Sequence, residues 1–214
     1  MSYDFMITLG ALAAVNAMGW LSPGPNMLAV ISASISKGQR TGFATALGLS
    51  LGGMLWAVAV VIGAVTLFEL FPKAVFTLRM LGASYLIWLG VKFLRSAKEN
   101  RITPLEVSQV NYSDWVAFRT GFFVVITNPK AAVFYSSVFT AFIPENAPIW
   151  LLVVIVIVSL LQALAQHCIT AMVFSSKTVV QRYQSASRAI TGAIGVLYCG
   201  LGLGVATDAM RRFS

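Results

Sequence analysis

Two short polar motifs interrupt apolar segments of the sequence, and both contain residues that can bind a small anion. The motifs are Ser22-Pro23-Gly24-Pro25-Asn26 and Thr127-Asn128-Pro129-Lys130. Each proline removes a backbone N–H donor and clashes with the preceding helical turn, so neither segment can continue as a regular helix. A half-helix that starts after such a break presents free N–H groups and a partial positive charge. Each motif therefore predicts a broken helix whose second half can bind a carboxylate.

Lys130 strengthens this interpretation because it lies near the middle of a predicted apolar span. A lysine at the centre of a membrane helix costs roughly 2.5–3.5 kcal/mol on insertion scales, so it usually faces a polar interior and has a function. We expect Lys130 to bind an anionic group, while Ser22, Asn26, Thr127 and Asn128 supply neutral hydrogen bonds. The predicted ligand is a small zwitterionic or anionic metabolite. The alternatives are kinks that only shape packing, and a shifted span that leaves Lys130 at the interface.

The composition indicates that these motifs lie in a membrane. Of the 214 residues, 58% are hydrophobic and 10% are charged, whereas a soluble domain is about 25% charged. The sequence has no charge between Asp4 and Lys37 or between Glu145 and Lys177. A helix of about 20 apolar residues crosses a bilayer, and runs such as 150–159 do not alternate as β-barrel strands do. We therefore predict an all-α integral membrane protein and no separate soluble domain.

Six transmembrane helices fit the apolar pattern. They are predicted at about 5–36, 42–71, 74–95, 114–143, 148–174 and 187–208. The first and fourth contain the proline motifs and are expected to be broken. Arg79 and Lys92 lie near the ends of the third, where their side chains can extend to the interface.

The two halves of the chain resemble each other. A shift of 104 residues places 25–32 on 129–136, so the two proline breaks coincide. Three helices in each half is an odd number, so the halves must have opposite orientations, as in the inverted repeats of many secondary transporters. We expect one transmembrane domain over 1–214, with repeats at about 1–95 and 114–214 and a cytoplasmic loop at 96–113.

The net charge of +8 reflects topology rather than nucleic-acid binding, because the basic residues flank apolar spans and form no soluble patch. Most lie near the first, third and fifth loops: Lys37, Arg40, Lys92, Arg95, Lys98, Arg101, Arg119, Lys177, Arg182 and Arg188. Only Lys73, Arg79, Arg211 and Arg212 lie on the other side. Because cytoplasmic loops carry excess Lys and Arg, we predict that the odd-numbered loops are cytoplasmic and both termini are outside.

The motifs Ser22-Pro23-Gly24-Pro25-Asn26 and Asn128-Pro129-Lys130 resemble the two signatures of the LysE/RhtB family of amino-acid exporters, the LysE-type translocators. The resemblance covers nearly the whole chain, including its length, its spans and its polar middle loop. It implies a bacterial inner-membrane protein that exports an amino acid or a similar small metabolite, driven by proton exchange. No cofactor or metal is expected, and Cys168 and Cys199 have no metal-ligand spacing.

One feature departs from the family pattern. Many relatives carry an aspartate shortly after the second-helix segment that resembles Leu47-Gly48-Leu49, whereas this chain has Gly52-Gly53-Met54 there. A proton-coupling carboxylate is therefore missing from its expected place. His167 is the only histidine, and histidine titrates near neutral pH, so His167 and Lys130 are the candidate proton carriers. The alternative for His167 is a side chain that is simply hydrogen-bonded within the bundle.

Several alternatives stay open on the sequence alone. A structural or assembly subunit without its own substrate would share this composition. An intramembrane enzyme is disfavoured, because one histidine, two isolated cysteines and no deep carboxylate offer little catalytic machinery. Gly48 with Gly52, and Gly200 with Gly204, form small-xxx-small pairs that permit close helix packing. We expect this packing within the chain, and the alternative is contact between the two chains of a homodimer.

Overall fold

The computed structural model describes residues 2–21, 24–70, 72–99, 113–144 and 147–213, and these residues form helices and no strand. The helices are α1 (Ser2–Leu21), α2 (Pro25–Lys37), α3 (Gln39–Leu70), α4 (Pro72–Lys98), α5 (Asp114–Ile126), α6 (Pro129–Phe142), α7 (Ile149–Val173) and α8 (Lys177–Phe213). The predicted all-α fold class is confirmed.

Both predicted helix breaks are present. α1 ends at Leu21 and α2 begins at Pro25, while α5 ends at Ile126 and α6 begins at Pro129. α5 and α6 are bent relative to each other by 59°. Each proline occupies the first turn of the helix that follows it, where its missing N–H costs nothing because that donor has no partner within the helix.

Three helices are long and apolar enough to cross a membrane among the described residues. They cover 39–64, 149–173 and 178–211, and the bent pair of α5 and α6 makes a fourth. The apolar part of α1, at 8–21, is shorter. α4 is 27 residues long but carries Arg79, Lys92, Arg95 and Lys98. The chain is therefore an all-α, multi-pass integral membrane protein.

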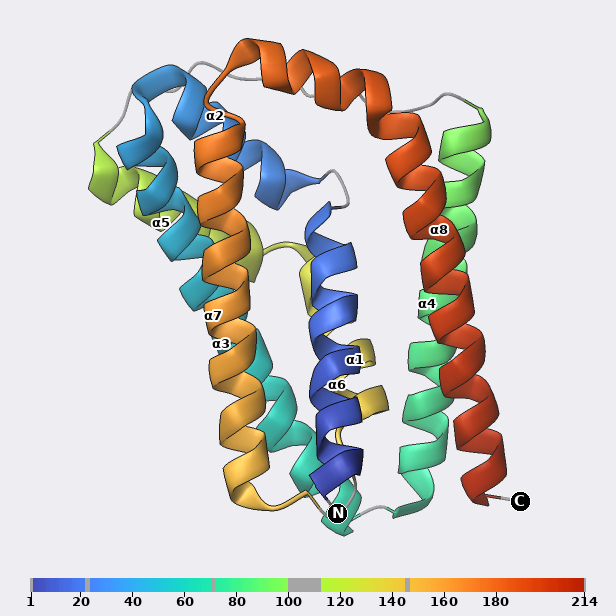
Figure 1. Cartoon of the computed structure of the whole chain (residues 1–214). Coiled ribbons are helices and arrows are strands. Elements are labelled where there is room, and N and C mark those ends of the chain that lie inside the picture. Colours follow the sequence, from blue (N-terminus) through green and yellow to red (C-terminus); the bar gives the residue numbers. More distant parts are fainter. Residues whose placement is uncertain (1, 22–23, 71, 100–112, 145–146, 214) are drawn as a thin grey trace.

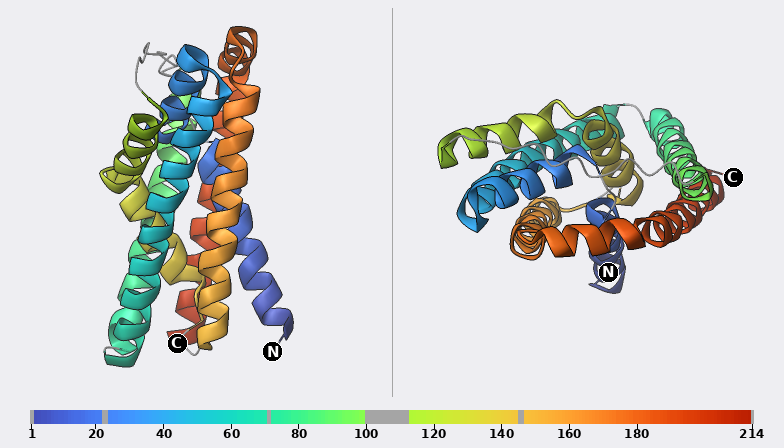
Figure 2. Two further views of the ribbon diagram at one scale, coloured as in Figure 1. Left: turned by 90° about the vertical axis from the view of Figure 1, so that its left-hand side faces the viewer. Right: turned by 90° about the horizontal axis from the view of Figure 1, so that it is seen from above.

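One half of each broken helix lies at the centre of the bundle, namely α1 and α6. Figure 1 shows α1 and α6 between a group formed by α3 and α7 and a second group formed by α4 and α8. α8 packs along α4, and α3 packs along α5 and α7. The N-terminal end of α1 and the C-terminal end of α8 lie at the same end of the molecule (Figures 1 and 2).

α8 starts earlier than the sequence suggests. The last span is predicted from about 187, whereas α8 begins at Lys177. Its first turns run across the top of the bundle before the helix turns down beside α4 (Figure 1). There, Val180 packs on Met27, Ile31 and Phe174. Residues 177–186 are the more polar part of α8, and they lie along the end of the bundle rather than through it (Figure 1).

The glycine pairs differ in what they contact. A Cβ added at Gly48 would overlap the Phe118 carbonyl oxygen of α5, and one at Gly52 would overlap Val125. The first pair therefore packs within the chain, as predicted. A Cβ at Gly200 or Gly204 would meet nothing within 4 Å, so the prediction of packing within the chain is wrong for the second pair. The homodimer stays a prediction.

Arg79 and Lys92, two of the basic residues of α4, differ in their exposure and in what they contact. Lys92 is exposed, and its Nζ lies 5.1 Å from the centroid of the Trp88 ring. Arg79 is only 2% exposed, and its Nη1 lies 3.8 Å from Oδ2 of Asp208 on α8. The buried guanidinium of Arg79 is paired with the half-exposed carboxylate of Asp208 on the neighbouring helix, which no single-helix pattern can show. Its extension to the interface stays a prediction.

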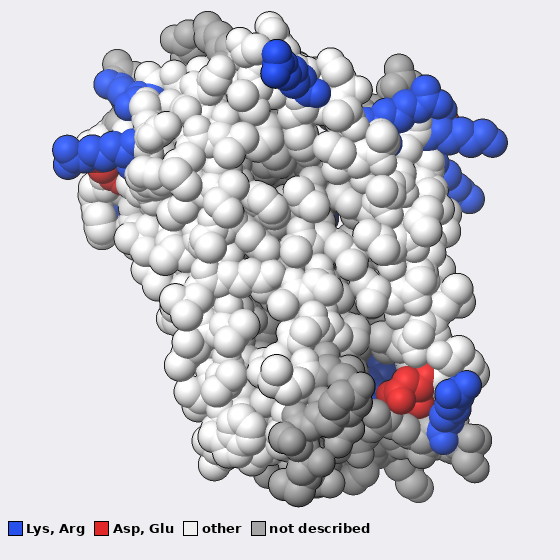
Figure 3. Space-filling model, viewed as in Figure 1, with Lys and Arg blue, Asp and Glu red and all other residues white. Residues whose placement is uncertain are grey.

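Basic side chains gather at one end of the molecule. Figure 3 shows most of the visible Lys and Arg at the end where α2 meets α3 and α7 meets α8. The described residues there include Lys37, Arg40, Arg95, Lys98, Arg182 and Arg188. The opposite end carries the Arg79–Asp208 pair and Arg211. The charge asymmetry predicted along the sequence is therefore present in space.

Candidate binding site

The two helix breaks meet through one hydrogen bond between their asparagines. Asn128 Nδ2 donates to Asn26 Oδ1 at 3.0 Å. The Asn128 Oδ1 accepts from the backbone N–H of Lys130 at 3.0 Å and so caps α6. Asn128 thus holds the starts of α2 and α6 against each other. Gly24 caps α2 with no side-chain hydrogen bond, so the first turn of α2 keeps donor groups that its own cap does not satisfy.

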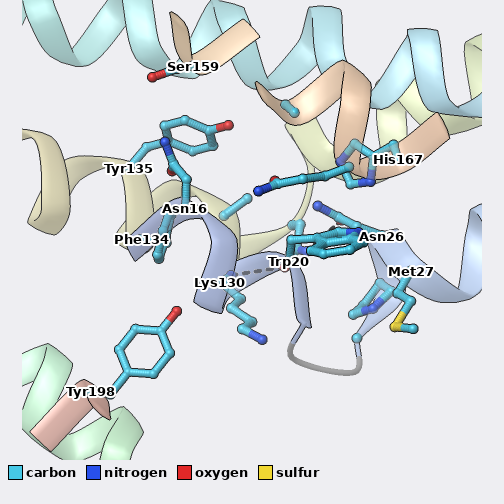
Figure 4. A pocket seen from close by; sticks show the side chains of 17 residues that line it. Asn16, Trp20, Asn26, Met27, Lys130, Phe134, Tyr135, Ser159, His167 and Tyr198 are labelled. Atoms are coloured by element: carbon cyan, nitrogen blue, oxygen red, sulfur yellow. Dashed lines mark hydrogen bonds between the residues drawn. The ribbon is translucent and has the colours of Figure 1, made fainter. Parts of the chain in front are cut away.

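A cavity of about 100 Å³ lies beside this junction. A single water needs about 10–15 Å³, so the space suits a group of several non-hydrogen atoms. Its walls come from α1, α2, α6, α7 and α8 (Figure 4). The polar lining residues other than tyrosine and tryptophan are Asn16, Asn26, Asn128, Lys130, Ser159, Gln166 and His167. The aromatic lining residues are Trp20, Phe134, Tyr135 and Tyr198.

The charge of the lining is positive. Lys130 carries the only formal charge among the described lining residues, apart from any on His167, and none of them is an Asp or Glu. The Lys130 Nζ lies 5.1 Å from the centroid of the Phe93 ring of α4. The N-terminal turns of α2 and α6 reach the same cavity and add a partial positive charge. This side of the cavity favours an anionic group.

The remaining polar lining is neutral and partly unsatisfied. The Tyr198 hydroxyl and the His167 Nδ1 are buried without a hydrogen-bond partner among the described residues. Tyr198 has no exposed surface, and in Figure 4 its hydroxyl points toward Phe134 and Lys130. Buried polar groups are nearly always hydrogen-bonded. Two unsatisfied groups on one cavity therefore make it a candidate site for a polar ligand.

The structure places most of the predicted site residues together. Gly24, Pro25, Asn26, Asn128 and Lys130 all line the cavity. Ser22 and Pro23 lie outside the described residues.

Two residues of the second motif lie apart from the cavity. Thr127 and Pro129 are exposed and absent from the lining. The Thr127 hydroxyl donates to the Phe123 carbonyl oxygen at 2.7 Å, so it serves the end of α5 rather than the cavity. The prediction that Thr127 offers a hydrogen bond to a ligand has no support in this geometry.

The candidate proton carriers lie on the same cavity. His167 and Lys130 both line it, as does Gln166. Gln162 instead donates from Nε2 to the Ala13 carbonyl oxygen at 2.7 Å and is not part of the lining. Asp114 lies outside the lining, where its Oδ2 is 2.7 Å from Arg40 Nε. The cavity thus brings both candidates together without a carboxylate among its described residues.

Of the lining residues outside the two motifs, the sequence suggested Trp20 and Tyr135 and missed Asn16, Ser159 and Tyr198. Trp20 and Tyr135 stand out as aromatic residues close to the two motifs, and both line the cavity. Asn16 and Ser159 are polar residues in long apolar segments. This isolated polarity is the signal that could have identified them as lining residues. Tyr198 gave no signal, because an aromatic residue in a membrane helix usually packs or anchors at an interface.

Broken helices that enclose a polar cavity inside a membrane bundle are characteristic of membrane transporters. Residues 17–209 match the family model described as LysE type translocator. The chain belongs to this family, so it is a transporter and not an enzyme, and the resemblance seen in its two motifs is confirmed.

Three relatives illustrate the match. The chain is 26% identical to the threonine efflux protein of Escherichia coli (strain K12) over 90% of this chain and 94% of the relative. It is 26% identical to that of Salmonella typhimurium (strain LT2), over 92% and 97%. It is 29% identical to an uncharacterized membrane protein of Pseudomonas aeruginosa, over 89% and 90%. No solved structure matches the chain.

Proposed function

We propose that the chain exports an amino acid or a small amino-acid-like metabolite across the bacterial inner membrane by secondary-active transport. Membership of the LysE type translocators and similarity to proteins named for threonine efflux support this function. One structural observation carries it: two broken helices meet at Asn26 and Asn128 beside a cavity that contains Lys130.

The substrate carboxylate binds at the positive side of this cavity. Lys130 supplies the full charge, and the first turns of α2 and α6 supply oriented N–H groups. Asn26 and Asn128 fix the relative position of the two helix starts. Because the carboxylate contacts both broken helices, a movement of one relative to the other changes its affinity. Transport requires such a difference between states.

The chain crosses the membrane six times, as two inverted repeats of three helices. Support comes from the two breaks, which occur at matching places in α1–α2 and α5–α6, and from the shared end of both termini (Figure 1). The end rich in Lys and Arg faces the cytoplasm (Figure 3). Both termini are then outside.

Export is coupled to proton entry, and His167 or Lys130 carries the proton. Both side chains line the substrate cavity, so protonation and substrate binding influence each other through direct electrostatics. The described lining offers no carboxylate that could perform this role.

Removal of the Lys130 charge tests the central claim. Lys130→Ala should reduce amino-acid export from loaded vesicles to background, with and without a pH gradient, because the substrate carboxylate loses its main counter-charge. The measurement is the rate at which a panel of labelled amino acids leaves vesicles that contain equal amounts of inserted protein.

Lys98→Ala is the matched control. Lys98 is an exposed lysine in the last turn of α4 and does not line the cavity. This variant should export at close to the parental rate. Undiminished export by Lys130→Ala would refute the assignment of the anion site, and lack of export by the parental chain for every amino acid would refute the proposed function.

A further inference from the structure

The cavity contains hydrogen-bond acceptors and aromatic rings that can bind an ammonium group, but no carboxylate among its described residues. Asp114 is paired with Arg40, and Asp208 lies next to Arg79, and neither belongs to the lining. A ligand with one ammonium and one carboxylate is therefore balanced by Lys130 and neutral groups. A second positive charge on the ligand would find no carboxylate to pair with and would be repelled by Lys130.

The ammonium of a zwitterion has neutral partners in this cavity. An ammonium donates three hydrogen bonds and accepts none. A neutral imidazole of His167 offers one acceptor nitrogen, and the amides of Asn16 and Gln166 each offer an oxygen. The Trp20 indole N–H is already used, since Nε1 donates to Thr170 Oγ1 at 2.8 Å. This bond fixes the Trp20 ring at the cavity, where its face can bind a cation.

The Tyr198 hydroxyl is then left for a different part of the ligand. It is buried, lines the cavity and has no partner among the described residues. It also lies beside the first broken helix, because a Cβ added at Gly19 would lie 3.4 Å from it and 3.2 Å from Phe134 Cζ. A hydroxyl both donates and accepts, so it matches a neutral polar group rather than the ammonium or carboxylate already bound elsewhere.

We propose that the cavity selects small zwitterions whose side chain is uncharged and carries a hydrogen-bonding group, and that Tyr198 is the residue that recognises this group. The proposal rests on the proposed function, because it concerns the substrate of the same site. Cationic amino acids are excluded, because a buried cationic side chain without a carboxylate is unfavourable. Aliphatic amino acids of equal size bind more weakly, because they leave the Tyr198 hydroxyl unsatisfied.

Threonine and valine are the matched probes, since they differ by a hydroxyl in place of a methyl group, and lysine tests the charge rule. The parental chain should bind and export threonine at least about tenfold better than valine, and lysine at least about tenfold less well than threonine. Tyr198→Phe removes one oxygen atom and should bring the threonine to valine ratio close to one, mainly through weaker threonine binding.

Tyr183→Phe is the control variant. Its hydroxyl donates to the Leu21 carbonyl oxygen at 3.0 Å, outside the cavity lining, so its threonine to valine ratio should equal that of the parental chain. Binding is measured on the purified protein, and export is measured from loaded vesicles, so a loss of transport does not hide a change in binding.

The outcomes distinguish failure of the selectivity proposal from failure of the proposed function. Equal binding of valine and threonine by the parental chain, competition by lysine, or an unchanged ratio in Tyr198→Phe would overturn the selectivity proposal and leave amino-acid export standing. Absence of binding and export for all three amino acids and for the rest of the panel would overturn the proposed function together with it.

Discussion

Asn128 uses both ends of its amide, and this links local helix capping to the geometry of the cavity. Its oxygen accepts from the Lys130 N–H, and its nitrogen donates to Asn26. An N-cap contributes about 1 kcal/mol to helix stability, and a buried hydrogen bond contributes a similar amount. The same side chain therefore stabilises the start of α6 and fixes that start against α2.

These two roles of Asn128 can be separated by substitution. Asn128→Ala should lower the stability of the folded protein by about 2 kcal/mol, because it loses the cap and the bond to Asn26. Asn128→Ser retains a cap acceptor and should cost about half as much. Thermal unfolding of the purified variants in detergent measures the difference. Equal stabilities for the Ala and Ser variants would show that the cap contributes nothing.

The role of a side chain was predictable from the sequence where its residue type is unusual for the apolar helix that contains it. Pro25, Pro129 and Lys130 conflict with an apolar helix, so the breaks and the charged site could be inferred. Tyr198 conflicts with nothing in its segment. Its place in the cavity depends on how α8 is rotated against the rest of the bundle, and that rotation is set by packing between residues far apart in sequence.

The close crossing of α3 and α5 shows what sequence patterns reveal about helices. The pair Gly48 and Gly52 predicts close packing, and the structure supplies the partner, with Gly121 of α5 facing the Thr45 carbonyl of α3. The equivalent pair at Gly200 and Gly204 has the same spacing but no neighbour within 4 Å. Spacing alone therefore identifies a face that permits close approach, and only the arrangement of the other helices shows whether anything approaches it.

Two alanine substitutions in the same helix test this crossing. In Gly48→Ala the new Cβ would overlap the Phe118 carbonyl oxygen, so α3 and α5 must separate, at a cost of about 2 kcal/mol. In Gly63→Ala the Cβ meets nothing within 4 Å, and the higher helix propensity of alanine should leave stability unchanged or raise it by up to about 1 kcal/mol. The measurement is thermal unfolding in detergent. Equal stabilities would contradict the close α3–α5 contact.

The cavity lies between two groups of helices. Lys130, Asn26 and His167 belong to α6, α2 and α7, whereas Tyr198 and Phe93 belong to α8 and α4. Figure 2 shows α4 and α8 together at one side of the bundle when it is viewed from above. A ligand that contacts both groups is sensitive to their relative position. The affinity for a ligand in this cavity would therefore depend on how the two groups of helices are placed relative to each other.

The proposed orientation of the chain rests on the uneven distribution of charge and can be tested by cysteine labelling. In a chain with Cys168 and Cys199 replaced by serine, a cysteine is placed at exposed Ser176, at the end rich in Lys and Arg, or at exposed Met210, at the opposite end. Because positively charged ends stay in the cytoplasm, Met210→Cys should react with a membrane-impermeant maleimide in intact bacterial cells. Ser176→Cys should react only after the cells are permeabilised. The reverse labelling pattern would place both termini in the cytoplasm and invert the direction in which the cavity must open for export.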